Sequence, residues 1–169
     1  FILPQTLGDY LADKKPATEP TSTAADAVVA ESQQQSEALL ALNGDCSIRS
    51  LHRELGGILW NHCGMSRTAT GLGEAIEQLG ELKQKFWQRG MVGGSGEVLN
   101  QELEQAGRVA DFIEFGELMC RDALQREESC GAHFREEYQE QGEAARNDAD
   151  FSHVTAWAHK GEDQPPESH

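Results

Sequence analysis

The feature that most constrains the fold is a helical repeat of apolar residues in three long segments of the chain. The segments are residues 47–63, 66–89 and 97–127. In each of them apolar side chains recur at spacings of three and four, which predicts an amphipathic helix. Asp45 or Ser47, Ser66 and Glu97 are the expected starts. Three such helices with short connections predict an all-α, up-and-down three-helix bundle, similar in layout to a spectrin repeat.

Two of these helices carry features that a simple bundle does not need. In the helix over 97–127, one apolar stripe is joined by a second, formed by Phe112, Phe115 and Met119. Two apolar faces predict contact with the bundle on one side and with another layer on the other. In the helix over 47–63, Gly56 and Gly57 each cost about 1 kcal/mol of helix propensity relative to Ala. Such a pair indicates close approach of another backbone.

The domain organisation follows from composition. Residues 1–20 are expected to be a lead-in segment, with a short helix capped by Thr6 and a linker that contains Pro16 and Pro20. Residues 21–137 form the bundle domain, including a partly buried helix that ends at Asn43-Gly44. Residues 138–169 read as an acidic, irregular tail with a possible strand near 153–158. Because the chain opens without Met or a basic leader, we expect a piece of a longer protein rather than a signal peptide.

Charge and cysteine usage narrow the class of partner. The formal net charge is −15, which argues against binding to nucleic acid or to anionic membrane surfaces. No apolar run has the length of a membrane span. The four cysteines show no paired spacing and are interpreted as free thiols in a reducing compartment.

Neither a metal site nor a catalytic site is predicted within the chain. His62 and Cys63 are adjacent and so cannot share one helix face, while His52 lies ten residues away. Cys130 and His133 could be drawn as a catalytic pair, although local pairs of this kind usually satisfy backbone groups. The glycines at 90–96 fit no phosphate-binding pattern. We therefore expect no catalytic, cofactor-binding or metal-binding residue here.

Residues 127–137 close the longest periodic segment and bring a His, an Arg and several carboxylates together around Gly131. A glycine at this place is typical of a helix end, because it adopts the left-handed conformation without steric cost. The simpler interpretation is a helix C-terminus whose His and Arg face the negative end of the dipole. The alternative is a loop that docks on a partner surface.

The run Glu-Ser-Cys-Gly-Ala-His-Phe-Arg-Glu at 128–136 resembles the segment after the long helix in flavoprotein subunits of succinate dehydrogenase and fumarate reductase. Residues 52–60 and 62–67 are similar to a helix pair of the same family, and residues 1–11 resemble the stretch after its flavin-binding domain in one bacterial branch. The resemblance makes Glu128, Gly131, His133, Arg135 and Arg67 domain-docking candidates. One departure is Cys130, where most members carry Arg.

The resemblance implies a C-terminal helical domain that packs on the flavin-binding domain of the same subunit and is inactive alone. In that family the parent subunit oxidises succinate to fumarate, or runs in reverse, with covalently bound FAD. Electrons pass to an iron–sulfur subunit and a membrane quinone-reactive subunit at the cytoplasmic face of the bacterial inner membrane. Two alternatives stay open: a free-standing helical interaction module, and the matching domain of a related flavoprotein such as L-aspartate oxidase or an adenylylsulfate reductase subunit.

Overall fold

The computed structural model describes residues 2–13, 22–161 and 164–169. The linker predicted before residue 21 lies outside the described residues. The chain separates into two compact units, Phe1–Ala38 and Leu39–His169, and each is described by itself. None of the described helices is both long enough and apolar enough to cross a membrane.

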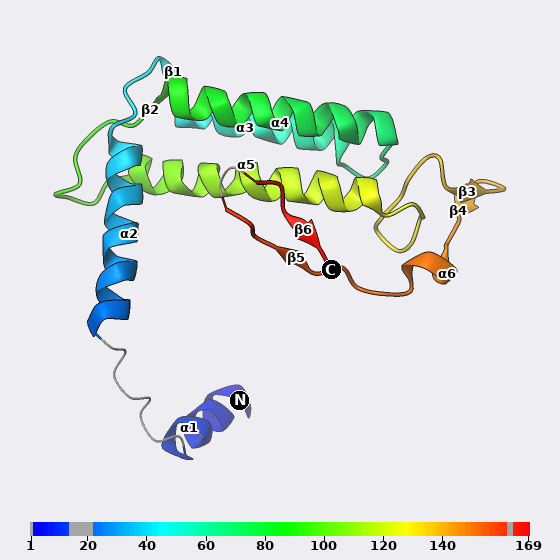
Figure 1. Cartoon of the computed structure of the whole chain (residues 1–169), viewed down its shortest axis with the longest axis horizontal. Coiled ribbons are helices and arrows are strands. Elements are labelled where there is room, and N and C mark those ends of the chain that lie inside the picture. The colour runs from blue at the N-terminus through cyan, green and yellow to red at the C-terminus, as the bar shows by residue number, and fades with distance from the viewer. Residues whose placement is uncertain (1, 14–21, 162–163) are drawn as a thin grey trace. The chain divides into compact units, whose positions relative to one another are not determined.

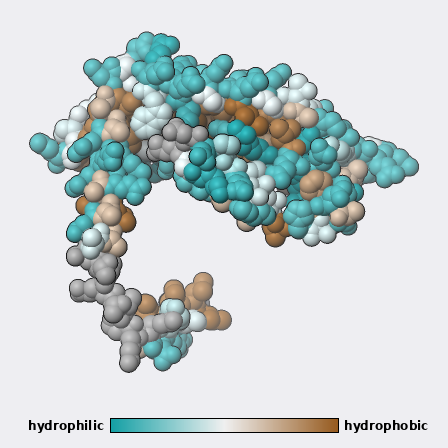
Figure 2. Space-filling model, in the orientation of Figure 1, coloured by the Kyte–Doolittle hydropathy of each residue, from teal (hydrophilic) through white to brown (hydrophobic). Residues whose placement is uncertain are grey.

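The first unit contains helix α1 (Ile2–Asp13) and most of helix α2 (Ser22–Leu40). Thr6 lies inside α1 and donates its hydroxyl to the Ile2 carbonyl at 3.0 Å, so its predicted role as an N-cap is wrong. The large apolar side chains of α1 are exposed, and Figure 2 shows them gathered as a hydrophobic surface. The helix that was predicted to end at Asn43-Gly44 stops at Leu40.

The second unit confirms the predicted all-α bundle. Its long helices are α3 (Ile48–His62), α4 (Ala69–Arg89) and α5 (Gln101–Gln125), and each contacts the other two (Figure 1). The apolar positions predicted from the repeat form the core. Its fully buried members are Leu51, Leu72, Ala75, Leu79, Phe86, Ala106 and Cys120.

The capping residues show why two predicted helix starts are wrong. Ser47 accepts a hydrogen bond from the Ser50 N–H at 3.2 Å, as predicted. Helix α4 instead begins after Thr68, whose hydroxyl accepts the Gly71 N–H at 3.0 Å, while Ser66 lies outside the helix and donates to Glu136 at 2.6 Å. Helix α5 begins after Asn100 rather than at Glu97, because the Asn100 side chain accepts two successive backbone N–H groups at 3.1 Å.

A close backbone crossing joins the start of α3 to the end of α4. Strand β1 (Cys46–Ser47) pairs in parallel with strand β2 (Gly90–Met91). Beside this pair, the Gly44 N–H donates to the Gly90 carbonyl at 2.8 Å. A Cβ on Gly44 would lie 2.2 Å from the Arg89 carbonyl oxygen, so only glycine fits.

The tail after α5 contains short paired elements. Strands β3 (Gln139–Glu140) and β4 (Glu143–Ala144) form a hairpin whose two turn residues both have positive φ, at 55° and 85°. A single helical turn, α6 (Asp148–Phe151), follows. The strand predicted near 153–158 is present only as β5 (Trp157–Ala158), which pairs with β6 (Glu167–Ser168). The indole N–H of Trp157 donates to Asp122 at 2.8 Å, which holds this hairpin against α5.

Candidate functional site

The 126–138 loop, defined by those residues, leaves α5 and turns back along the bundle. Cys130 and His133 exchange two backbone hydrogen bonds of 2.8 and 3.1 Å, so the residues between them form a tight turn. Gly131 occupies this turn with φ of +60°, the left-handed region that favours glycine. The predicted helix end at Gly131 is therefore displaced: α5 ends at Gln125, and the glycine serves a turn inside the loop.

His133 is held by its two ring nitrogens. Arg67 Nη1 lies 3.0 Å from Nδ1. Because a guanidinium can only donate, Nδ1 accepts and the proton sits on Nε2, which donates to the Arg126 carbonyl at 2.9 Å. Burial, together with the positive charges of Arg67, Arg135 and Arg126, lowers the pKa of His133. The imidazole is therefore neutral, and neither of its nitrogens is paired with Cys130.

Arg135 is buried and closes the C-terminal end of α5. Its side chain is only 2% exposed. Nη1 donates to the carbonyls of Ala123 and Leu124 at 2.9 and 3.1 Å, which are among the last carbonyls of the helix and lack an intrahelical partner. A cation at this helix end also opposes the negative pole of the dipole.

Glu137 performs the opposite task at the start of α4. One carboxylate oxygen accepts the Ala69 N–H at 2.6 Å, and the other accepts from Arg135 Nε at 3.1 Å. Desolvation raises the pKa of Glu137, but the hydrogen bonds from Ala69 and Arg135 outweigh it, so the net pKa is lowered. The pair Arg135–Glu137 thus caps two antiparallel helices at neighbouring ends, each with the charge that its dipole favours.

Glu128 ties the loop to the tail. Its side chain is 2% exposed, accepts from Arg126 Nε at 2.8 Å and from the Asn147 N–H at 2.9 Å. The Asn147 hydrogen bond is the main reason that its pKa is lowered, against the effect of desolvation. The neighbouring Ser129 exchanges hydrogen bonds with the backbone of Arg135 at 2.9 and 3.1 Å. These bonds join the two ends of the loop.

The structure brings all five docking candidates into or beside this loop but gives them different surroundings. Glu128 and Arg135 are buried and use their polar atoms inside the chain. Arg67 and His133 are half-buried and Gly131 is exposed. Sequence reasoning did not single out Arg126 or Glu137. Their signal is an Arg and a Glu two residues apart, repeated at 126–128 and 135–137.

The second apolar stripe of α5 lies on the surface. Phe112, Phe115 and Met119 are 41%, 60% and 40% exposed. They sit at spacings of three and four, so they share one line of the helix, away from the buried line through Ala106, Val109 and Ile113. Three large apolar side chains exposed in a row are typical of a surface that another layer covers.

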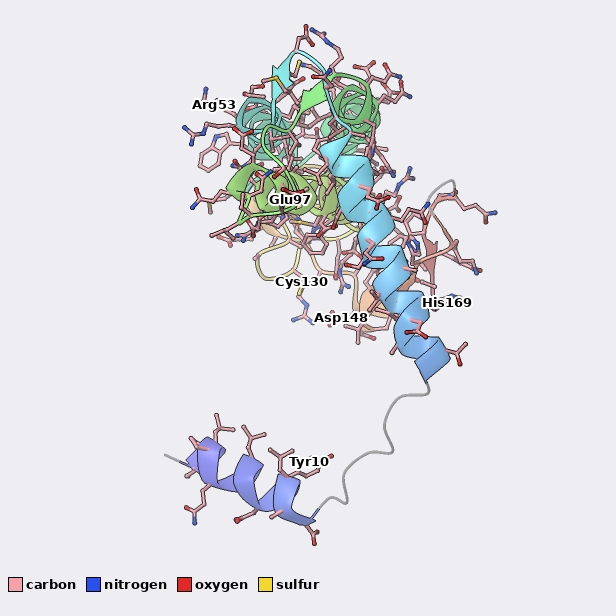
Figure 3. The ribbon with its side chains drawn as sticks, turned by 90° about the vertical axis from the view of Figure 1, so that its left-hand side faces the viewer. Tyr10, Arg53, Glu97, Cys130, Asp148 and His169 are labelled. Carbon is pink, nitrogen blue, oxygen red and sulfur yellow. The ribbon has the colours of Figure 1, made fainter. Side chains whose placement is uncertain are left out.

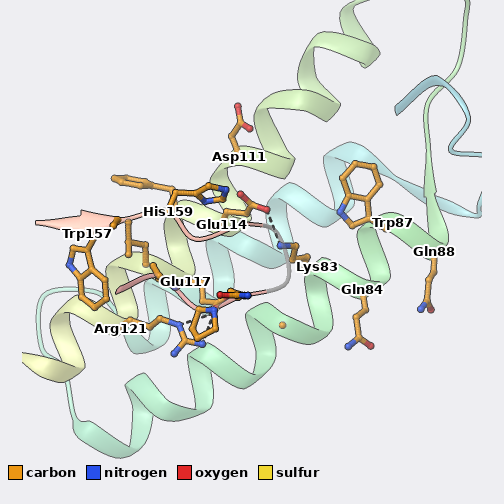
Figure 4. A pocket seen from close by; sticks show the side chains of 18 residues that line it. Lys83, Gln84, Trp87, Gln88, Asp111, Glu114, Glu117, Arg121, Trp157 and His159 are labelled. Carbon is orange, nitrogen blue, oxygen red and sulfur yellow. Dashed lines mark hydrogen bonds and ion pairs between the residues drawn. The ribbon is translucent and has the colours of Figure 1, made fainter. Parts of the chain in front are cut away.

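An open groove of about 1030 Å³ runs between α4, α5 and the tail residues 157–161 and 164–166. Trp87 lies at one end and Trp157 at the other in Figure 4. The groove's two cations form ion pairs: Lys83 with Glu114 at 2.9 Å, and Arg121 with Glu117 at 2.7 Å. These two cations are therefore neutralised, whereas Asp111 and His159, which also line the groove, form no ion pair among the described residues.

Two of the four cysteines, Cys63 and Cys120, are buried in the bundle, whereas Cys46 and Cys130 are partly exposed. The buried side chains of Cys63 and Cys120 lie close enough to shift each other's pKa. This contact and the charge of Arg67 lower the pKa of Cys63, while the same contact and burial raise the pKa of Cys120. All four cysteines are free. Among the described residues, no group of three or more His, Cys, Asp or Glu side chains is placed to hold a metal ion.

The fold is therefore that of an all-α helical bundle domain, with a loop that secures two helix ends and one apolar stripe left exposed. Residues 52–168 match the family described as "Fumarate reductase flavoprotein C-term". The chain belongs to this family.

Relatives and solved structures agree with this assignment. The fumarate reductase flavoprotein subunit of Haemophilus influenzae is 26% identical over 140 residues, which cover 82% of this chain and 23% of that protein. L-aspartate oxidase 2 of Ralstonia nicotianae is 28% identical over 109 residues, covering 64% and 18%. A quinol-fumarate reductase with menaquinol molecules shares the fold with a TM-score of 0.76 and 25% identity, covering 91% of this chain and 26% of that one. Mycobacterium smegmatis Sdh1 in complex with UQ1 gives 0.72 and 25%, covering 95% and 26%. The chain thus spans about a quarter of the proteins that it matches.

Proposed function

We propose that this chain is the C-terminal helical domain of the flavoprotein subunit of a succinate dehydrogenase or fumarate reductase, and that its role there is structural. The observation that carries the proposal is the match of residues 52–168 to that family. The exposed stripe of α5 supports it, because a domain that leans on another needs an apolar surface left uncovered by its own fold.

The parent subunit would hold FAD in another domain. Every strand in the described part of this chain is two residues long, so these strands do not build the sheet on which a dinucleotide-binding fold places its pyrophosphate. The residues described here therefore do not fit a flavin site. When bound in the parent, FAD would accept a hydride from succinate or return one to fumarate, and this domain would take no part in that step.

The proposal divides the docking candidates by role. Arg135 and Glu128 are positioning residues, because burial leaves them no surface to offer a neighbour. They hold the turn at Gly131 and the ring of His133 in place through the loop backbone. Gly131 and His133 of the loop, with Arg67 bound to His133, would then face the flavin-binding domain. The stripe of Phe112, Phe115 and Met119 would supply the larger apolar contact.

The test is made in the full subunit that the proposal requires. Phe112→Ser with Phe115→Ser should lower the flavin content of the purified subunit and its succinate-dependent dye reduction, because the stripe would no longer bury apolar surface. Val98→Ser with Leu99→Ser is the matched control, since these residues are 72% and 91% exposed and lie outside the stripe. Equal flavin content and activity in both double variants would reject the docking role.

Activity separates the proposal from its alternatives. The likeness to L-aspartate oxidase 2 favours that enzyme as a second candidate, and turnover of L-aspartate without turnover of succinate would select it. Stoichiometric flavin or turnover in the isolated 169-residue chain would contradict the structural role. A reading frame without a flavin-binding region would select the free-standing interaction module.

For the whole assembly, we propose an iron–sulfur subunit and a membrane quinone-reactive subunit as partners, at the cytoplasmic face of the bacterial inner membrane. The similarity to a quinol-fumarate reductase supports this arrangement. Co-purification of the three subunits from solubilised membranes, but not from the soluble fraction, is the expected result.

A further inference from the structure

Two arginines of α3 stand apart from the other cations of this acidic chain. Among the described residues, every other Lys and Arg side chain makes a hydrogen bond or an ion pair. The guanidinium groups of Arg49 and Arg53 have no such partner in the part of the chain that the structure describes, and both residues are exposed. Arg53 projects away from the bundle helices (Figure 3). A chain with a net charge of −15 thus leaves two adjacent positive charges unneutralised.

These arginines lie on one line of α3 with a glycine and a tryptophan. Residues 49, 53, 56 and 60 are spaced by four, three and four, so at 100° per residue they fall within an arc of about 60°. The buried residues Leu51, Leu55 and Ile58 occupy the opposite side of the helix. We call the line formed by Arg49, Arg53, Gly56 and Trp60 the α3 outer face.

Gly56 of this face and the neighbouring Gly57 have no packing explanation within the described residues. The sequence predicts close approach of another backbone at Gly56 and Gly57, yet a Cβ added at either would meet nothing within 4 Å. Both residues also have helical neighbours on each side, so no turn requires them. Each glycine weakens the helix relative to alanine, so the described residues supply a cost for this pair and no contact that offsets it.

Trp60 is the large apolar group of the same face. Its side chain is 81% exposed, one turn beyond Gly56. Tryptophan and arginine are the residues that most often dominate binding surfaces, because one offers a wide flat area and the other a forked cation. The adjacent carboxylate, Glu54, is already bound to Lys85 at 2.6 Å, so it does not cancel the charge of the face.

We propose that the α3 outer face binds an acidic segment of another polypeptide, whose carboxylates pair with Arg49 and Arg53 while its backbone crosses at Gly56-Gly57 and packs against Trp60. Charge selects the partner: an acidic segment neutralises the two free guanidinium groups, and a basic one would be repelled. The absent side chains at the glycines let the two backbones approach closely. This surface is distinct from the α5 stripe, and the proposal does not rest on the proposed function.

Site-specific photo-crosslinking in cells that make the full protein tests the proposal. Trp60→p-benzoylphenylalanine keeps a large aromatic group at the contact, and mass spectrometry identifies the crosslinked segment. We expect one main product whose crosslinked segment carries several Asp or Glu residues and comes from another protein. Adding Arg49→Glu and Arg53→Glu should reduce the yield about tenfold.

Matched variants separate contact from folding. Gly56→Ala with Gly57→Ala should reduce the crosslink several-fold although alanine favours the helix, so unfolding cannot explain the loss. Gly73→Ala in α4, where an added Cβ also meets nothing within 4 Å, and Arg108→Glu on α5 should leave it unchanged. A product joining two copies of this chain, a crosslinked segment without carboxylates, insensitivity to the arginine reversals, or no product above that from a crosslinker at the exposed Glu81 would each overturn the proposal.

Discussion

Replacing Arg135 by Met is expected to destabilise the bundle strongly. The change removes the hydrogen bonds from Nη1 to the carbonyls of Ala123 and Leu124 and leaves both carbonyls without their partner. Hydrogen bonds that involve a charged group contribute about 1.5–3 kcal/mol each. Methionine restores most of the packing of the arginine stem, and the pair with the partly exposed Glu137 adds little after solvent screening. The expected loss is therefore about 4 kcal/mol.

Urea unfolding of the chain, monitored by circular dichroism at 222 nm, measures this loss of unfolding free energy. For a slope near 2 kcal/mol/M, the loss corresponds to a fall of about 2 M in the urea midpoint. Arg135→Lys keeps the charge but cannot form the fork, so about half of the loss is expected. Arg108→Met is the control, because Arg108 pairs only with Glu104 on an exposed face and should cost about 0.5 kcal/mol or less. Equal midpoints for Arg135→Met and Arg108→Met would refute the assignment of Arg135 as a helix cap.

Two further outcomes are expected from the 126–138 loop. Because the folded chain holds the pKa of His133 below the ordinary value of 6.5, the unfolded chain binds more protons, so the free energy of unfolding should fall as pH drops below about 6.5. His133→Gln should remove that part of the pH dependence in urea titrations between pH 7.5 and 5; an identical profile would contradict it. Gly131→Ala should cost about 1 kcal/mol at φ of +60°, whereas Gly73→Ala, in a helix with open space above it, should gain up to about 1 kcal/mol. Thermal unfolding gives both values, and changes of the same sign would show that backbone conformation does not decide them.

The three bundle helices could be predicted from the sequence because their faces are set by a local repeat. Leu51, Leu55, Leu72 and Leu79 are all buried where the spacing places them. The first residues of these helices were harder to predict from the sequence. Ser66 and Thr68 are both capable caps; the chain uses Thr68, which accepts the Gly71 N–H, while Ser66 donates to Glu136, 70 residues away.

The position of the 126–138 loop could be predicted from the sequence, but the contacts that its side chains make could not. The cluster around Gly131 is dense in charge, which marks it as unusual. Its pairings join residues far apart in the chain, such as Arg67 with His133 and Ala69 with Glu137. Arg126 and Arg135 each precede a Glu by two residues. Arg135 is the buried one because it lies where the ends of α4 and α5 meet, and no local sequence pattern predicts that position. The pairing of β5 with β6 could not be predicted either, because strands of two residues are too short to show a repeat.

The position of Arg135 and Glu137 in the chain has a consequence for how the protein is made. All three bundle helices have been synthesised by Gln125, yet the groups that secure the start of α4 and the end of α5 arrive only with residues 135 and 137. A nascent or truncated chain that stops before them has its core but frayed helix ends. The cap of α4 and the cap of α5 therefore both depend on residues that follow the last bundle helix in the chain.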